Sequence, residues 1–283
     1  MNKHNWPPVL DEYTQLNPLQ RLLSLLDLEP IEENLFRGYH PPDRTRRLFG
    51  GQVIAQALVA AMNTVPKDRS PHSLHAYFLR PGDPSVPALF EVERIRDGKS
   101  FTTRRVVVVQ NGLAIFNMDA SFHISEPGLA HQQAMPQLSP PDENQLVEGL
   151  KQRPFLSFRE NHRQLLEEVP QQPEQQIWIK ANGFAPLDPR LQLALLAYES
   201  DEALLGTARM PHRGKFERSD MQVASLDHSI WFHESVNVND WLLYSLESPA
   251  AAAARGYTRG SIFSAEGKLV ASCMQEGLIR LRS

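Results

Sequence analysis

The fold is decided by residues 50–62, which read Gly-Gly-Gln-Val-Ile-Ala-Gln-Ala-Leu-Val-Ala-Ala-Met. Alanine and leucine favour helix, and the segment has no charged side chain, so we expect a helix that is buried on nearly all sides. Four strand-like segments follow it, at residues 73–79, 88–96, 100–110 and 113–124. A buried helix followed by long antiparallel strands predicts an α+β fold in which the sheet wraps around the helix.

The second half of the chain repeats this plan. A strand is expected at residues 177–180 and an apolar helix at 191–205. Further strands are expected at residues 222–232, 241–247, 253–264 and 268–279. An offset of 155 aligns Thr103-Arg104 with Thr258-Arg259 and Gly112 with Gly267. Two units of one plan indicate a duplication, with the two sheets expected to join edge to edge.

Three parts are therefore predicted along the chain. Residues 1–125 form the first unit, with a lead-in helix at 19–28, and residues 176–283 form the second. Residues 126–175 are dense in Pro, Gln and Glu, which is typical of a linker, with one short helix near residues 161–168.

Composition excludes several classes of function. A net charge of −4 over 283 residues gives no sign of nucleic-acid binding, and no apolar run approaches the roughly 20 residues of a membrane span. The first residues have no apolar core of a secretory signal, so the cytoplasm is the expected location. Cys273 is the single cysteine, which excludes an internal disulfide and any multi-cysteine metal site.

Residues 221–233 bring together side chains that suggest hydrolytic chemistry. They include Ser225, Asp227 and His228, but such close neighbours on one strand cannot line up as a serine protease-like relay. There is also no Gly-x-Ser-x-Gly elbow and no His-Glu-x-x-His zinc motif. We expect His228 and His233 to be packed or hydrogen-bonding residues.

Two other polar residues lie where apolar ones are expected. Asp201 falls on the apolar stripe of the second helix, where burial would raise its pKa toward that of a base working near neutral pH. Gln275 shares a strand face with Ala271 and Cys273. A structural role fits either residue equally well, but the first half has Ala120 in place of Gln275 and no acid in its helix. This asymmetry is what one active and one degenerate half would show.

Five segments carry a resemblance to a known family. They read Arg-Leu-Phe-Gly-Gly-Gln-Val at 47–53, His-Ala-Tyr-Phe-Leu-Arg-Pro-Gly-Asp at 75–83, Gln-Ile-Trp-Ile-Lys at 176–180, Leu-Asp-His-Ser-Ile-Trp-Phe-His at 226–233 and Gln-Glu-Gly at 275–277. With them the chain resembles the acyl-CoA thioesterase II family from about residue 19 to residue 280. The resemblance implies a double hotdog fold, that is, two tandem helix-wrapped antiparallel sheets joined into one long sheet.

The family also implies a site and a reaction. Its members orient a hydrolytic water with an Asp on the second helix, a Ser or Thr before the Leu/Ile-Asp-His-Ser segment, and a Gln in the last strand. These positions hold Asp201, Ser225 and Gln275 here. The resemblance implies hydrolysis of medium- to long-chain fatty acyl-CoA without a cofactor or metal, by a homo-oligomer such as a dimer of double hotdogs.

Residues that contact the substrate are expected at three places. The N–H groups of Gly50 and Gly51 are candidates to bind the oxyanion, although tight helix packing explains these glycines equally well. Basic segments at 44–47 and 209–218, including Arg47 and Arg213, are candidates to bind the phosphates of coenzyme A. Two alternatives to the hydrolase remain, a hotdog enoyl-CoA hydratase and a non-catalytic acyl-CoA binding module.

Overall fold

The computed structural model describes residues 10–41, 47–142, 152–159, 169–216 and 218–282. The first half contains helices α1 (Leu10–Gln15), α2 (Pro18–Leu26) and α3 (Gly50–Asn63), and strands β1 (Glu29–Glu32), β2 (Leu35–Gly38), β3 (Arg69–Phe78), β4 (Ala88–Asp97), β5 (Phe101–Gln110) and β6 (Leu113–Ile124). The second half contains strands β7 (Phe155–Phe158) and β8 (Glu174–Ala181), helices α5 (Pro189–Ser200) and α6 (Leu204–Arg209), and strands β9 (Met221–Ser225), β10 (Asp227–Phe232), β11 (Leu242–Ala252), β12 (Arg255–Ser264) and β13 (Leu269–Leu281).

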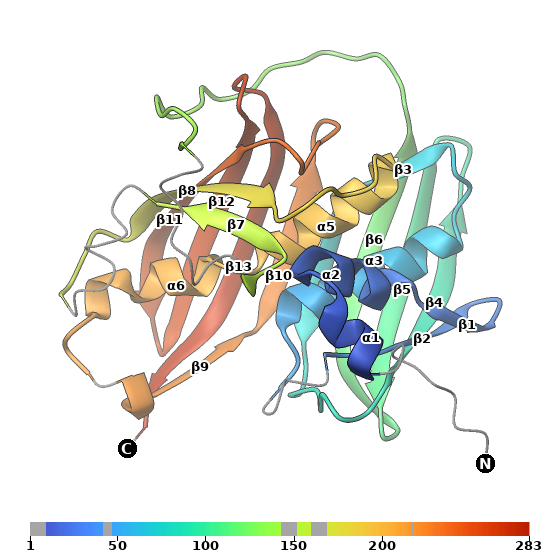
Figure 1. Ribbon diagram of the computed structural model, residues 1–283, viewed down its shortest axis with the longest axis horizontal. Coiled ribbons are helices and arrows are strands. Elements are labelled where there is room, and N and C mark those ends of the chain that lie inside the picture. The colour runs from blue at the N-terminus through green and yellow to red at the C-terminus, as the bar shows by residue number, and fades with distance from the viewer. Residues whose placement is uncertain (1–9, 42–46, 143–151, 160–168, 217, 283) are drawn as a thin grey trace.

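The strands of the described residues form one 13-stranded antiparallel sheet. Its first half runs β2-β4-β5-β6-β3 and its second half runs β8-β11-β12-β13-β10, which is the same order in both halves. Strands β3 and β10 pair with each other and join the two halves edge to edge (Figure 1). The shared order supports the predicted duplication, and the architecture is that of a double hotdog.

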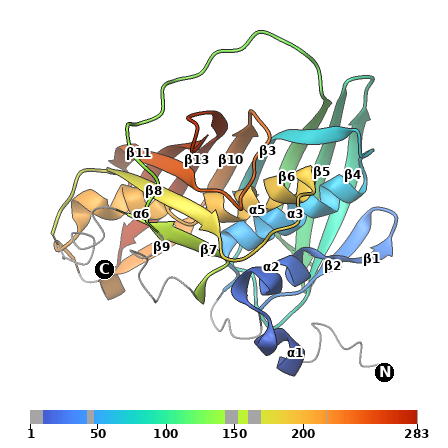
Figure 2. The same cartoon turned by 45° about the horizontal axis from the view of Figure 1, so that its top comes forward.

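Helices α3 and α5 pack against each other on one face of this sheet, one from each half (Figure 1). Helix α3 is buried along almost its whole length, as its alanine-rich sequence predicts. A second view shows the amphipathic α2 beside α3, on the side away from the sheet (Figure 2). The pairing of α3 with α5 brings the first turn of α3 to the last turn of α5.

The second predicted helix is shorter than expected. The sequence predicts one helix over residues 191–205, but α5 ends at Ser200 and α6 begins at Leu204. The carbonyl oxygen of Ser200 accepts a hydrogen bond from the Tyr244 hydroxyl at 2.8 Å instead of serving a further helical turn. Ser and Asp at 200 and 201 also have low helix propensity. Asp201 is therefore the C-cap residue of α5.

The strand predicted over residues 222–232 is interrupted at Leu226. Strand β9 places Ser225 opposite Gly277, whereas β10 places Ser229 opposite Met274, so the register shifts by one residue between them. The side chain of Asp227 accepts a hydrogen bond from the Glu276 N–H at 2.6 Å at this break. Such irregularities re-aim side chains, and this one ends β9 at Ser225.

The predicted offset of 155 holds after the last hairpin turn but is wrong before it. Arg104 is fully buried, and the buried residue at its place in β12 is Thr258 rather than Arg259. The offset there is 154, because the turn after β12 is one residue longer than the turn after β5. A one-residue slip exchanges the two faces of a strand, so Arg259 corresponds to the exposed Arg105.

Two strands were not anticipated from the sequence. Strand β1 contains Pro30, and strand β7 lies inside the segment predicted to be a linker, where it pairs with β8. The short helix expected near residues 161–168 lies outside the described residues. No helix in the described part of the chain is both long and apolar enough to cross a membrane.

Candidate active site

Asp201 lies where the two halves meet, at the end of α5 and against the start of α3. Its carboxylate is buried, with 8% of the residue exposed. The Gly51 N–H donates to Asp201 Oδ2 at 2.8 Å, and Gln275 Nε2 donates to Asp201 Oδ1 at 2.5 Å. Each carboxylate oxygen thus has one protein donor and keeps a lone pair for another partner. The structure therefore brings Asp201 and Gln275 into direct contact.

Burial shapes the acid–base behaviour of Asp201. Desolvation raises the pKa of Asp201 from 3.8 to about 6, and the hydrogen bonds from Gln275 and Gly51 oppose that rise. The helix dipole at the start of α3 also favours a negative charge at this place. Asp201 is consequently ionised at neutral pH but has a higher proton affinity than an exposed aspartate, which suits a general base.

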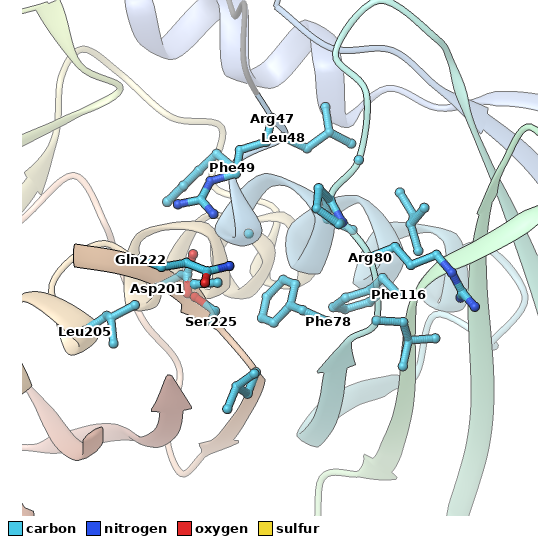
Figure 3. Close-up of a pocket in the computed structure, with 18 residues that line it drawn as sticks. Arg47, Leu48, Phe49, Phe78, Arg80, Phe116, Asp201, Leu205, Gln222 and Ser225 are labelled. Atoms are coloured by element: carbon cyan, nitrogen blue, oxygen red, sulfur yellow. The ribbon is translucent and has the colours of Figure 1, made fainter. Parts of the chain in front are cut away.

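Ser225 and Asp201 face the same cavity of about 530 Å³ (Figure 3). Asp201, Ser225 and Gln222 lie at one side of this cavity, and the rings of Phe78 and Phe116 lie at the other. The remaining lining residues come from the loop before α3, its first turns, the end of β3 with the turn after it, β6, α6, β9 and Leu226. The cavity therefore combines a polar corner with an apolar wall.

Gln275 contacts Asp201 from the sheet side. Strand alternation buries it together with Ala271 and Cys273, as predicted. Only 2% of Gln275 is exposed, and it does not line the cavity. Its Oε1 has no hydrogen-bond partner among the described residues. In this geometry Gln275 acts on the carboxylate of Asp201.

The glycines at the start of α3 are required by close packing. A Cβ on Gly50 would lie 2.7 Å from Asp201 Oδ2, and a Cβ on Gly51 would overlap the Tyr198 carbonyl oxygen. No side chain caps α3, because its N-cap residue is Phe49. The first N–H groups of the helix are thus accessible to groups from outside the helix, and one of them binds Asp201.

Comparisons with known proteins identify the family. The acyl-CoA thioesterase family profile matches residues 155–278, and the acyl-CoA thioesterase N-terminal domain profile matches residues 40–123. The chain is 42% identical to acyl-coenzyme A thioesterase 8 of Mus musculus, over 92% of this chain and 88% of that protein. It is 41% identical to acyl-CoA thioesterase 2 of Haemophilus influenzae, over 93% of this chain and 98% of that protein.

Solved structures give the same result. The crystal structure of the acyl-CoA thioesterase II TesB2 from Mycobacterium marinum matches with a TM-score of 0.80 and 44% identity, covering 93% of this chain and 98% of that one. The chain belongs to the acyl-CoA thioesterase II family. It is a thioester hydrolase. A hot dog fold protein from Alicyclobacillus acidocaldarius, 18% identical with a TM-score of 0.75 over 92% of this chain and 97% of that one, shares the fold.

The two expected phosphate-binding arginines of the thioesterase lie in different places. Arg47 is exposed, lines the cavity, and donates from Nη2 to the Val223 carbonyl oxygen at 2.9 Å. Arg213 is half-buried and is not among the residues that line the cavity. Residues 44–46 lie outside the described residues. Arg47 is therefore the one of the pair that the cavity geometry favours as a substrate contact.

His233 and Asp227, two other polar residues of the 221–233 segment, make structural contacts. His233 Nε2 contacts Ser272 Oγ at 2.9 Å, and the Asp227 carboxylate holds the break between β9 and β10. Burial raises the pKa of Cys273 to about 12, so its thiol is no nucleophile at neutral pH. Within the described residues, no group of His, Cys, Asp and Glu could hold a metal ion.

His228 is buried and hydrogen-bonded, as expected, but sequence reasoning missed its partners and the place of Thr258 opposite Gln275. His228 is fully buried and contacts both Ser200 and Gln275, and Thr258 is buried directly opposite Gln275 in β12. A signal for His228 existed, because it alternates with the apolar Ile230 and Phe232 on one strand face. Its partner Ser200 comes from another element, and no spacing along the chain predicts that pairing.

Proposed function

We propose that the thioesterase hydrolyses medium- to long-chain fatty acyl-CoA by direct attack of a water molecule, with Asp201 as general base. The water oxygen bonds to the thioester carbonyl carbon while its proton passes to Asp201. The tetrahedral oxyanion then collapses, the carbon–sulfur bond breaks, and coenzyme A leaves as a thiolate. A thiolate leaving group has a pKa near 8.5 by analogy with cysteine, so strong acid assistance is not required.

The observation that carries this proposal is the carboxylate of Asp201 beside Ser225 in one cavity. Asp201 keeps a lone pair on each oxygen, and its raised pKa of about 6 lets it take a proton from water at neutral pH. The Ser225 hydroxyl, on the same side of the cavity, is the second group that orients the water. Gln275 contributes to this orientation through Asp201, which it touches directly.

The oxyanion requires a donor on the far side of the carbonyl carbon. The Gly51 N–H already binds Asp201, so the N–H of Gly50 is the better candidate of the two glycines. Gly50 lines the cavity, and the helix N-terminus behind it favours a developing negative charge. The thioester would then lie between the start of α3 and Ser225.

The remainder of the cavity suits an acyl chain and a phosphorylated carrier. Leu48, Phe78 and Phe116 supply an apolar wall, and the exposed Arg47 supplies a cation. The similar proteins from mouse and Haemophilus influenzae are also named as acyl-coenzyme A thioesterases. Coenzyme A carries phosphates that an arginine binds well. These features support fatty acyl-CoA as the substrate.

Both halves of the chain would contribute to the site. The second half supplies Asp201, Ser225 and Gln275, and the first supplies the start of α3, so the site needs both halves even though one is catalytically degenerate. A dimer of double hotdogs stays a prediction from the resemblance. So does the division at residues 125 and 176, since β7 lies in the expected linker yet pairs with β8.

The alternatives lack their expected groups. A hotdog hydratase would use an Asp–His pair on the helix side, and neither α5 nor α6 contains a histidine. The buried His228 contacts Ser200 and Gln275 rather than Asp201. A binding module without activity would not explain a buried carboxylate that costs folding free energy and faces an open cavity.

The test is release of free thiol from decanoyl-CoA, followed with a thiol reagent. Asp201→Asn is expected to lower kcat by at least about a hundredfold, since a general base contributes 10²–10⁴-fold. Gln275→Ala is expected to lower kcat by at least about tenfold. Both variants are checked for folding by circular dichroism. Near-wild-type turnover in folded Asp201→Asn would contradict the proposal.

A further inference from the structure

His228 is a buried histidine that the proposed mechanism does not use. It lies on β10 with none of its surface exposed, and it does not line the cavity. Burial lowers the pKa of His228 from 6.5 to about 3, so its ring is neutral at physiological pH. A neutral imidazole has one N–H donor and one acceptor nitrogen, and the neighbours decide which nitrogen carries the proton.

The neighbours of His228 select one tautomer. Ser200 Oγ donates its single hydrogen to the Ala197 carbonyl oxygen at 2.9 Å. His228 Nε2 lies 2.9 Å from the same Ser200 Oγ, so Nε2 must be the donor in that contact. Nδ1 is then the acceptor, and it faces Gln275 Nε2 at 3.4 Å.

This tautomer fixes the orientation of the Gln275 amide. The two N–H bonds of Gln275 then serve Asp201 Oδ1, at 2.5 Å, and His228 Nδ1, at 3.4 Å. A reversed amide would place Oε1 against the Asp201 carboxylate and against the lone pair of Nδ1, where acceptor meets acceptor twice. His228 therefore adds a second reason for the amide to present its donor to Asp201.

The first half of the chain builds the same sheet without such a pair. In the matching strand positions it has Leu74 and Ala120, which lie opposite each other and are buried. An apolar pair thus satisfies the fold at this place. His228 and Gln275 occur in the half that contains Asp201, which indicates a role in the site rather than in the sheet.

We propose that His228 is a positioning residue for thioester hydrolysis, holding the Gln275 amide so that its N–H remains on the carboxylate of Asp201. The proposal rests on the function proposed above for Asp201. Ser200 belongs to the same relay, because its hydroxyl selects the tautomer of His228. Without this relay the amide of Gln275 turns more freely, and Asp201 loses the donor that holds one of its oxygens.

A pair of variants separates positioning from packing. In His228→Asn the side-chain Oδ1 takes the place of imidazole Nδ1 and can accept from Gln275, whereas in His228→Gln the amide reaches the place of Nε2 and contacts Ser200 instead. Both lose the imidazole ring, so their packing defects are similar. We expect His228→Gln to lower kcat about tenfold with KM within about twofold, and His228→Asn to recover most of that loss. Equal kcat values for the two folded variants would overturn the proposal.

A double-mutant cycle gives the second readout. If His228 acts only through Gln275, adding His228→Gln to Gln275→Ala causes no further loss of kcat. Ser200→Ala is a milder perturbation of the same relay, because it removes one oxygen atom. It is expected to lower kcat about threefold in the wild-type background and to have no effect in the Gln275→Ala background. Additive losses in these cycles, or an unchanged kcat in Ser200→Ala alone, overturn the positioning role.

The outcomes for Asp201 and for His228 are distinguishable. Loss of turnover in Asp201→Asn and Gln275→Ala, with no effect of the His228 and Ser200 variants, would remove the positioning role and leave the general base in place. Retained turnover in folded Asp201→Asn would remove the general base itself. Melting temperatures of all variants are measured alongside, so that kcat is compared between folded proteins.

Discussion

Replacing Asp201 with asparagine is expected to stabilise the thioesterase at neutral pH while it removes activity. The folded protein holds Asp201 with a pKa of about 6, against 3.8 for an ordinary aspartate, mainly because of burial. The unfolded chain therefore releases this proton at lower pH than the folded protein does. As pH rises from about 4 to 6 the folded state loses stability relative to the unfolded state, and above about 6 this loss is complete.

The size of this change in the free energy of unfolding follows from the raised pKa of Asp201. A shift of about two pKa units corresponds to about 3 kcal/mol once Asp201 is ionised in both states, and about 2 kcal/mol of it accumulates between pH 4.5 and 7.5. Asparagine lacks this penalty but replaces one acceptor with a donor, which costs about 1 kcal/mol at either pH. We expect Asp201→Asn to match wild type at about pH 4.5 and to exceed its stability by about 2 kcal/mol at about pH 7.5.

The measurement is denaturant unfolding of both proteins at several pH values. The difference between variant and wild type removes the contributions of the other titrating groups. Asp68→Asn, which changes an exposed acid outside the cavity, controls for the loss of one negative charge. If the stability difference between Asp201→Asn and wild type is the same at both pH values, Asp201 is not a buried carboxylate with a raised pKa, and the reasoning is refuted.

Substitutions at three other residues of the site, with their controls, have distinct expected outcomes. Ser225→Ala is expected to lower kcat about tenfold to a hundredfold with little change in KM, and Ser225→Thr to keep most activity because it keeps the hydroxyl; equal losses in both would contradict a role for the hydroxyl. Arg47→Glu is expected to raise KM for acyl-CoA by about fivefold or more, less so at high salt. Replacing the exposed Arg96 of β4, in Arg96→Glu, is expected to have no such effect. Gly51→Ala is expected to lower the free energy of unfolding by about 1–3 kcal/mol, because its Cβ meets the Tyr198 carbonyl oxygen, and chemical denaturation measures this.

The fold was largely predictable because its signals are periodic and local. The uncharged helix at 50–62 and the strands at 88–96, 100–110 and 113–124 appear close to their expected bounds, since burial of the helix and of one face of the sheet imposes a regular pattern. The break after Ser200 was not predictable, because the Tyr244 hydroxyl that binds its carbonyl lies 44 residues away. Long-range partners leave no trace in a local pattern.

The candidate site was likewise predictable from local patterns but not in its long-range contacts. Asp201 and Gln275 were identifiable as polar residues on apolar faces, and the structure places them in contact. The alignment of the two halves was wrong by one residue at Arg104. The Thr-Arg pairs before the turn and the glycines in it matched at one offset, although the two turns differ in length by one residue. The alternation of buried and exposed residues in β5 and β12 corrects this alignment. That alternation is known only when the pairing of both strands with their neighbours is known.

The two helix N-termini differ in how their N–H groups are bound. Helix α5 is capped by its own Asp188, whose Oδ1 accepts from the Arg190 and Leu191 N–H groups. Helix α3 has no side-chain cap, and its Gly51 N–H receives the carboxylate of Asp201 from the other half.

The helix C-termini differ in a matching way. Asp201 caps α5, whereas Thr64 caps α3 and is held by the buried guanidinium of Arg104, whose Nε donates to Thr64 Oγ1 at 2.9 Å. Arg104 occupies the strand position that Thr258 has in the second half. A buried cation bound to Thr64 and Asp97 cannot act as a base, since arginine remains protonated at all relevant pH values. Each helix N-terminus thus binds one carboxylate, but Asp188 caps its own helix, whereas Asp201 reaches α3 from the other half and lines the cavity with Ser225.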